Sequence, residues 1–241
     1  MISPYGMEIV ESCLTCKLRA ERVFCDLPQS ALQAFEEIKY TTAYPEGAVL
    51  FVEHQEPRGI FLICKGSVKL SVSAANGKTM IVKIAEAGEV LGLSATVSGR
   101  PYEVTAVTID PCQINFVKRE DFLRFLKNDV QVCFKVAEQL SEKYHTVCNE
   151  VRSLGLSHSA AEKLAKLLLE WSSKNGESGR PEPRVKLRLT HEEIAQMIGT
   201  SRETVTRLLA DLKRHQIVNS RGSTLVIRNQ SALRDLANHN N

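Results

Sequence analysis

The sequence predicts an α+β protein made of a small β-roll, a long helix and a C-terminal helical part, and three observations carry this prediction. Short β-patterns separated by glycine turns fill residues 29–117. Apolar residues then recur at spacings of four and three over residues 133–154. Residues 190–227 contain two helical patterns joined at a glycine and followed by two short β-patterns. These patterns are typical of a roll, of a helix packed on a second helix, and of a helix-turn-helix with a β-hairpin.

Length and composition set the outer limits of the interpretation. With 241 residues the chain can hold two domains, each with its own core. It has no long apolar run, and its first residues lack the basic and apolar parts of a secretory signal. We therefore expect a cytoplasmic protein without a membrane partner, whose seven cysteines are thiols or metal ligands rather than disulfides.

The charge is unevenly distributed along the chain. The net charge is +3, but residues 155–241 carry 14 Lys and Arg against 9 Asp and Glu, or +5. The remaining residues carry 17 basic against 19 acidic side chains, or −2. A basic C-terminal part is typical of a phosphate-binding end, although an excess this small identifies one only together with a motif.

Three of the cysteines are clustered near the N-terminus. Cys13, Cys16 and Cys25 lie within 13 positions and include a CxxC pair. Thiolates on one short segment can converge on a metal, and a fourth ligand must then come from further along the chain. An iron–sulfur cluster, a structural zinc ion or thiol–disulfide switch, and inert cysteines are all compatible with this pattern.

Residues 29–117 have the pattern of an all-β domain. Residues 49–51 and 65–72 are predicted strands, and the second of them alternates at period two. Asn76-Gly77 is the strongest short hairpin signal in the chain. Many short strands at regular spacing predict a small roll or barrel, in which Cys64 is a core residue.

A long helix is predicted from about Lys118. Seven residues on it step by four and three in turn, which gives a narrow seam over three heptads. Such a seam is typical of two helices packed on each other, so we expect a parallel homodimer; the alternative is a helix packed on its own roll. The predicted interface residues are Cys133, Ala137, Leu140, Tyr144, Val147, Val151 and Leu154.

Two short helices joined by a tight turn are predicted after residue 189. Thr190 and Glu193 form a capping-box pattern at the start of the first helix. Gly199 ends this helix, and Ser201 can cap the next one.

The second of these helices has an apolar and a polar face. The apolar face consists of Val205, Leu208, Leu209 and Leu212, at helical spacing. On the polar face, arginines can contact guanine and a glutamate can accept from cytosine, which is the chemistry needed to read base edges in a major groove. The alternative is an ordinary solvated face with ion pairs such as Glu203–Arg207. The caps and the glycine turn favour a DNA-binding helix-turn-helix. Its predicted DNA-binding residues are Ser201, Arg202, Glu203, Thr206 and Arg207.

The run TSRETVTRLL at residues 200–209 closely resembles the recognition helix of the cyclic AMP receptor/FNR (Crp/Fnr) family of bacterial transcription regulators. Residues 217–227 support the resemblance, because their hairpin pattern would form the wing of a winged helix. The resemblance implies a β-roll of the cyclic-nucleotide-binding type, a dimerisation helix and a winged helix-turn-helix. The expected parts are a cysteine-containing segment at residues 1–28, an effector roll at 29–117, a dimerisation helix at 118–154 and a DNA-binding domain at 155–241.

The resemblance also implies a cofactor. In oxygen-sensing FNR proteins three N-terminal cysteines and one from the effector domain hold a [4Fe–4S] cluster. The matching ligands here would be Cys13, Cys16, Cys25 and Cys112, and the expected signal is oxygen, nitric oxide or redox state. Eight residues separate Cys16 from Cys25, more than in the well-known oxygen sensors. This departure is tolerable, since doubling the length of a loop costs only about 0.6 kcal/mol.

The same resemblance argues against cyclic AMP as a ligand. The cyclic AMP receptor needs a carboxylate for the ribose hydroxyl and an arginine–serine pair for the cyclic phosphate. The first position falls here on Leu93 or Ser94, and the second on Glu103 and Val104, with Arg100 displaced by three residues. A carboxylate repels a phosphate. A different small-molecule effector in the roll therefore remains the alternative to sensing by the cysteines.

The partners implied by the resemblance are double-stranded DNA, a second copy of the chain and RNA polymerase. Two recognition helices would enter successive major grooves about 34 Å apart on a palindromic site. Arg202, Glu203 and Arg207 match the RExxxR pattern of the receptor branch, so half-sites resembling TGTGA are expected. The sequence has no P-loop, nucleophile elbow or HExxH motif, and we do not expect an enzyme.

Overall fold

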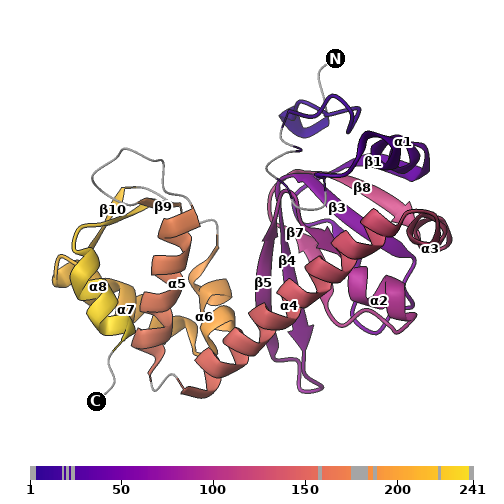
Figure 1. Cartoon of the computed structure of the whole chain (residues 1–241). Coiled ribbons are helices and arrows are strands. Elements are labelled where there is room, and N and C mark those ends of the chain that lie inside the picture. The colour runs from indigo at the N-terminus through magenta and orange to yellow at the C-terminus, as the bar shows by residue number, and fades with distance from the viewer. Residues whose placement is uncertain are drawn as a thin grey trace. The chain divides into compact units, whose positions relative to one another are not determined.

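In the computed structural model the chain divides into two compact units, residues 1–146 and 147–241 (Figure 1). The structure describes residues 4–17, 19, 22, 25–156, 159–174, 184–186, 189–221 and 224–238. Within these ranges no helix has the length and apolar character needed to cross a membrane.

The N-terminal unit contains two four-stranded antiparallel sheets. The first has the strand order β1-β8-β3-β6, with bounds Lys39–Tyr44, Cys112–Lys118, Gly59–Lys65 and Val90–Leu91. The second has the order β2-β7-β4-β5, with bounds Val49–Phe51, Thr105–Thr108, Ser67–Ser73 and Thr79–Glu86. The predicted hairpin at Asn76-Gly77 is confirmed: it joins β4 to β5, and Gly77 has a φ of +81°. Apolar side chains from both sheets, such as Phe51, Phe61 and Ile114, fill the core between them.

Short helices accompany the sheets, so the expectation of an all-β stretch over residues 29–117 is wrong in two places. Helix η1 (Pro4–Gly6) and helix α1 (Gln29–Ile38) precede β1, and α2 (Leu93–Ser98) follows β6. In α1 the buried residues are Ala31, Leu32 and Phe35. This spacing is that of one helical face, and it allows α1 to cover the outer face of the first sheet.

The long helix expected from Lys118 is in fact two helices, α3 (Arg119–Asn128) and α4 (Val130–Leu156). The break is at Asp129, whose backbone is extended, with φ −138° and ψ 107°. The Asp129 carboxylate accepts hydrogen bonds from the backbone N–H groups of Gln131 and Val132, at 2.9 and 3.1 Å. A side chain that satisfies the first free N–H groups of a helix starts that helix.

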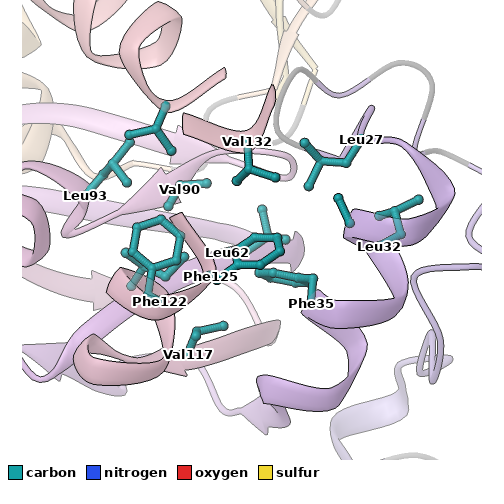
Figure 2. Packing of buried hydrophobic residues seen from close by; sticks show 13 residues of the cluster. Leu27, Leu32, Phe35, Leu62, Val90, Leu93, Val117, Phe122, Phe125 and Val132 are labelled. Atoms are coloured by element: carbon teal, nitrogen blue, oxygen red, sulfur yellow. The ribbon is translucent and has the colours of Figure 1, made fainter. Parts of the chain in front are cut away.

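A second core lies on the outer face of the β1-β8-β3-β6 sheet and joins it to α1, α3 and α4. Figure 2 shows its side chains around Leu62 of β3, with Phe35 from α1, Phe125 from α3 and Val132 from α4. The rings of Phe35 and Phe125 lie 6.0 Å apart. One apolar cluster therefore holds together the start of the chain, the sheet and the long helix.

The C-terminal unit is built of helices and a small sheet. Its helices are α5 (Ala160–Lys174), α6 (His191–Ile198), α7 (Arg202–Arg214) and α8 (Gln230–Ala237). Its strands are β9 (Arg184–Lys186), β10 (Val218–Arg221) and β11 (Thr224–Ile227), in the order β10-β11-β9. The predicted wing is the antiparallel β10–β11 pair. The α+β class and the order of roll, long helix and winged helix-turn-helix are as expected from the sequence.

Candidate functional site

Two helix caps and a glycine in the left-handed region fix the turn between α6 and α7. Thr190 and Glu193 form the full capping box: the Thr190 hydroxyl accepts from Glu193 N–H, and the Glu193 carboxylate accepts from Thr190 N–H at 3.0 Å. Gly199 ends α6 in the left-handed region, with φ 69° and ψ 41°. Ser201 caps α7 by accepting from the Thr204 N–H at 3.2 Å. These contacts fix the direction in which α7 leaves the turn.

Helix α7 buries one face and exposes the other. Val205, Leu209 and Leu212 are buried. The residues predicted to contact DNA, which are Ser201, Arg202, Glu203, Thr206 and Arg207, are all exposed. They lie together in the first turn and a half of the helix, the part of a recognition helix that contacts base edges.

The charged side chains on this face are not paired as in an ordinary solvated helix. No salt bridge joins Glu203 to Arg207 in the part of the chain that the structure describes. Glu203 accepts hydrogen bonds from its own backbone N–H and from Ser201, which lowers the pKa of its carboxyl. Thr206 is held by its bond to the Arg202 carbonyl at 2.9 Å and by His191 of α6, also at 2.9 Å. Both arginines therefore remain available to an external ligand.

The residues of the predicted dimer seam lie on α4, and most of them are exposed. Cys133, Ala137 and Val147 are exposed, and Tyr144 and Val151 are 68% and 65% exposed. Leu140 is half-buried and packs against the outer core of the roll. The side chain of Leu154 lies outside the described residues. The alternative of a helix packed on its own roll thus applies to one side of α4, where Val132 and Val136 are buried.

Two exposed apolar residues of α4 are not among the predicted interface residues. Val130 is 83% exposed and Phe134 is 65% exposed. The signal is present in the sequence, because Val130 lies three positions before Cys133 and Phe134 lies three positions before Ala137.

The four predicted metal ligands are divided between the two cores. Cys13 and Cys25 are half-buried and pack against the outer core, and Cys16 is half-buried on the same segment. Cys112 is fully buried in the core between the sheets. Cys64, expected to be an ordinary core residue, is 9% exposed and lies near the N-terminal cysteines. As placed, no three His, Cys, Asp or Glu side chains among the described residues form a group able to hold a metal ion.

A cavity of about 910 Å³ lies between α4 and the turn from β5 to β6. Its lining includes Lys83, Glu89 and Lys143. Burial, followed by the nearby Lys83, lowers the pKa of Lys143, whose amino group donates to the Val90 carbonyl at 2.8 Å. Of the positions compared with the cyclic AMP receptor, Leu93 is fully buried in the outer core and Glu103 is exposed.

Comparisons with known proteins agree with this architecture. The family model described as cyclic nucleotide-binding domain matches residues 41–129, and the Crp-like helix-turn-helix domain matches residues 162–236. The cAMP-activated global transcriptional regulator CRP of Pasteurella multocida is 24% identical over 185 residues, or 76% of this chain and 88% of that protein. The CRP-like cAMP-activated global transcriptional regulator of Mycobacterium tuberculosis is 24% identical over 211 residues, or 88% of this chain and 94% of that protein.

A solved structure shows the same fold. FixK2 from Bradyrhizobium japonicum superposes with a TM-score of 0.74 at 23% identity, covering 85% of this chain and 100% of that one. The two matched domains follow each other in the order of the roll and the helix-turn-helix, and the curated relatives are transcription regulators rather than enzymes. The chain therefore belongs to the Crp/Fnr family of DNA-binding transcription regulators.

Proposed function

We propose that the chain is a cytoplasmic homodimeric regulator that binds palindromic DNA with TGTGA-like half-sites through α7, with RNA polymerase as its partner. The observation that carries this proposal is the exposed set of Arg202, Glu203 and Arg207 at the start of a helix capped on a rigid turn. Arg207 would contact guanine O6 and N7, and Glu203 would accept from a cytosine amino group. Glu203 is exposed and its pKa is lowered by hydrogen bonds from its own backbone N–H and from Ser201, so it is an ionised acceptor at neutral pH.

Helix α4 supports the homodimer. Val130, Phe134 and Tyr144 expose more than 60% of their surface, and Val147 and Val151 continue the apolar series. Apolar side chains at heptad-like spacing are stabilised when a second helix removes them from water. A second copy, packed along the exposed apolar residues of α4, would also supply the second recognition helix that a palindromic site requires.

For the signal, we propose a [4Fe–4S] cluster bound by the N-terminal cysteines. Cys13 and Cys25 pack on the core that also holds Val132 and Val136 of α4, so a metal group there would lie close to the dimer helix. The thiolates that the segment offers are the usual ligands of such clusters, which react with oxygen and nitric oxide. The fourth ligand implied by the family resemblance, Cys112, does not fit as placed, since its thiol lies in the core between the sheets. A structural zinc ion or a thiol switch would use the same cysteines.

A small-molecule effector is a second candidate, favoured by the cavity beside α4. Lys83 and Glu89 form an ion pair in this lining and Lys143 adds a further cationic group, so an anionic or zwitterionic ligand fits it. We do not propose cyclic AMP, because the buried Leu93 leaves no carboxylate for a ribose hydroxyl and Glu103 would repel a phosphate.

The test of the DNA-binding proposal is fluorescence anisotropy with labelled duplexes at fixed salt. A palindrome of TGTGA half-sites is compared with one of TTGAT half-sites and with a random duplex. Arg207→Ala should weaken binding to the TGTGA palindrome by about 1–3 kcal/mol and relax the preference at one base pair. Arg124→Ala, which removes the same charge from an exposed position on α3, serves as the matched control.

An equal loss on all three duplexes would make Arg207 a phosphate contact and not a base reader. Preference of the unmodified protein for TTGAT would refute the half-site assignment. Sedimentation of Phe134→Glu and Tyr144→Glu variants tests the dimer, and both should be monomeric if α4 forms the interface.

A further inference from the structure

The two faces of β8 serve different parts of the N-terminal unit. On one face, the Gln113 amide donates to the Val10 carbonyl at 2.6 Å and accepts from Val10 N–H at 2.8 Å. Asn115, two residues on, donates to Cys13 Sγ at 3.5 Å. Between them Ile114 belongs to the core between the sheets. Because successive strand residues point to opposite faces, the N-terminal segment lies over the face of Gln113 and Asn115.

Cys112 lies on the other face, with Ile114. Its thiol lies near the Asp110 and Ser67 carbonyls, at 3.2 and 3.4 Å, and it is completely buried. Burial raises the pKa of Cys112 to about 11. The thiol is fitted closely to Gly66, where an added Cβ would come within 2.5 Å of Sγ. Cys112 is thus a packing residue of the roll, separated from Cys13 by the thickness of the sheet.

Cys64 of β3 lies on the face that the N-terminal segment covers. Ile60 and Leu62 belong to the outer core, and Cys64 continues their alternation. The register with β8 shifts between Ile63 and Lys65, which makes Cys64 the extra residue of a bulge. Lys65, next to it, also points to this side, because its amino group donates to the Glu8 carbonyl at 2.5 Å.

The charges around Cys64 agree with this placement. Burial raises the pKa of Cys64 to about 11, and the nearby Cys25 and Cys16 also raise it. Burial raises the pKa of Cys13 to about 12, with Cys64 and Cys25 among its neighbours. Cys112 has no cysteine among the groups that shift its pKa.

Hydrogen-bonded turns shorten the N-terminal segment between its cysteines. Cys16 N–H donates to the Cys13 carbonyl at 3.4 Å, and Cys25 N–H donates to the Arg22 carbonyl at 2.9 Å. Arg19 N–H and Arg22 N–H make the two intervening bonds of the same type, at 3.4 and 3.1 Å. Each of these turns brings its first and fourth residues close together. Cys13 and Cys16 are the two ends of one such turn and Cys25 ends another, so the segment is more compact than its sequence spacing implies.

Building on the metal-binding function proposed above, we propose that Cys64, and not Cys112, completes a four-thiolate site with Cys13, Cys16 and Cys25. Four thiolates suit a [4Fe–4S] cluster or a zinc ion. Cys64 lies at the bulge of β3, on the face of the sheet that the N-terminal segment covers, and would complete the set from there. Arg22, whose stem packs on Gly88, supplies a positive charge beside the thiolates.

The test uses the full chain with single substitutions, loaded under nitrogen with ferrous iron and sulfide or, in parallel, with zinc alone. Cys25→Ser is the positive control, and Cys148→Ser, at an exposed position of α4, is the negative control. Metal and sulfide per chain and visible absorbance are measured, with circular dichroism to check folding. Cys64→Ser should lower the bound metal at least fivefold, as Cys25→Ser does, whereas Cys112→Ser should stay within twofold of the unmodified protein.

The opposite pattern, with metal lost in Cys112→Ser and kept in Cys64→Ser, would overturn the assignment while leaving the metal-binding function intact. A protein that takes up neither iron and sulfide nor zinc, whichever cysteines it carries, would refute the metal-binding function and the assignment with it. If Cys25→Ser abolishes the uptake of iron and sulfide, the site holds an iron–sulfur cluster; if it abolishes only the uptake of zinc, the site holds zinc.

A second measurement requires no substitution in the roll. The metal-free full chain is oxidised with diamide, which takes up the two hydrogens released when two thiols join, and its peptides are mapped by mass spectrometry. A disulfide from Cys64 to Cys13, Cys16 or Cys25 is the expected product. A disulfide from Cys112 to one of these three would contradict the proposal, as would the absence of any disulfide at Cys64.

Discussion

The arginines of α7 are exposed and the thiols of the N-terminal segment are half-buried, and the two sets are held by different means. Arg202 and Arg207 stand on a helix whose own residues form its caps and whose other face is buried. The backbone at Cys13 is held from outside the segment, by the Glu36 carboxylate of α1, which accepts its N–H at 3.0 Å.

This difference determines which substitutions should disturb the arginines of α7 and which should disturb the thiols. The geometry of α7 is determined within about two dozen consecutive residues, and only changes in those residues or in the core beneath them should disturb it. The geometry of the thiols depends on strands and a helix further along the chain, so distant substitutions should alter their reactivity without altering the segment itself.

The largest expected effect is at the core beneath α7. Leu209 is 2% exposed, and Leu209→Ala should lower the free energy of unfolding of the C-terminal unit by about 2–5 kcal/mol, since it removes a buried side chain and leaves a cavity. Chemical denaturation followed by the fluorescence of Trp171, the only tryptophan, measures this loss. A change below 1 kcal/mol would mean that the caps, and not the core, hold the helix.

A smaller loss is expected at the turn itself. Gly199→Ala should cost about 1–2 kcal/mol, because its φ of +69° is unfavourable for an L side chain, although no atom lies within 4 Å of the added Cβ. The same denaturation experiment applies, with Gly77→Ala in the β4–β5 hairpin as the matched control. That variant has a similar φ of +81° and should leave the Trp171 transition unchanged.

The capping box should contribute less still. Thr190→Ala removes the hydroxyl that accepts from Glu193 N–H, at an expected cost of about 1 kcal/mol. Thr190→Ser keeps the acceptor and should restore most of the stability. If both variants lose the same amount, packing of the threonine methyl is responsible instead of the hydrogen bond.

The smallest change in stability at neutral pH, with a clear change in reactivity, is expected at Cys13 in the metal-free chain. Burial raises its pKa from 9.0 to about 12, so the folded state holds its proton more tightly than the unfolded state. The resulting stabilisation is present below pH 9 and is lost as the pH rises from 9 towards 12, and Cys13→Ser should flatten this part of the pH profile.

The neighbours of Cys13 offer a paired test of the same point. Glu36 raises the pKa of this thiol and Lys39 lowers it. At pH 8, Glu36→Gln should therefore speed the alkylation of Cys13 by iodoacetamide, and Lys39→Gln should slow it. Equal changes in both variants would indicate altered access to the thiol and not altered charge.

The parts of the molecule that could be predicted from the sequence are those with local causes. Thr190, Glu193, Gly199 and Ser201 were recognisable because a cap or a left-handed turn depends on residues within a few positions. The β4–β5 hairpin was predicted for the same reason.

The parts that could not be predicted depend on contacts between distant residues. The break between α3 and α4 at Asp129 could not be predicted, because in the sequence Asp129 looks like an ordinary polar residue of one continuous helix. The bulge that sets Cys64 apart exists only because β3 pairs with β8, some fifty residues later in the chain, and its register shift has no signature in the sequence around Cys64. Cys64 therefore looked like one more small apolar residue of a strand.

The position of α1 has a consequence for how a change at the thiols would be felt elsewhere. The Glu36 carboxylate of α1 accepts a hydrogen bond from the backbone N–H of Cys13. The preceding residue, Phe35, is buried in the cluster that contains Val132 and Val136 of α4. A single short helix, α1, therefore contacts both the first cysteine and the core into which the long helix packs. Under the proposed thiol signal, regulation requires no relay across the roll, because a displacement of α1 would act on Cys13 and on α4 together.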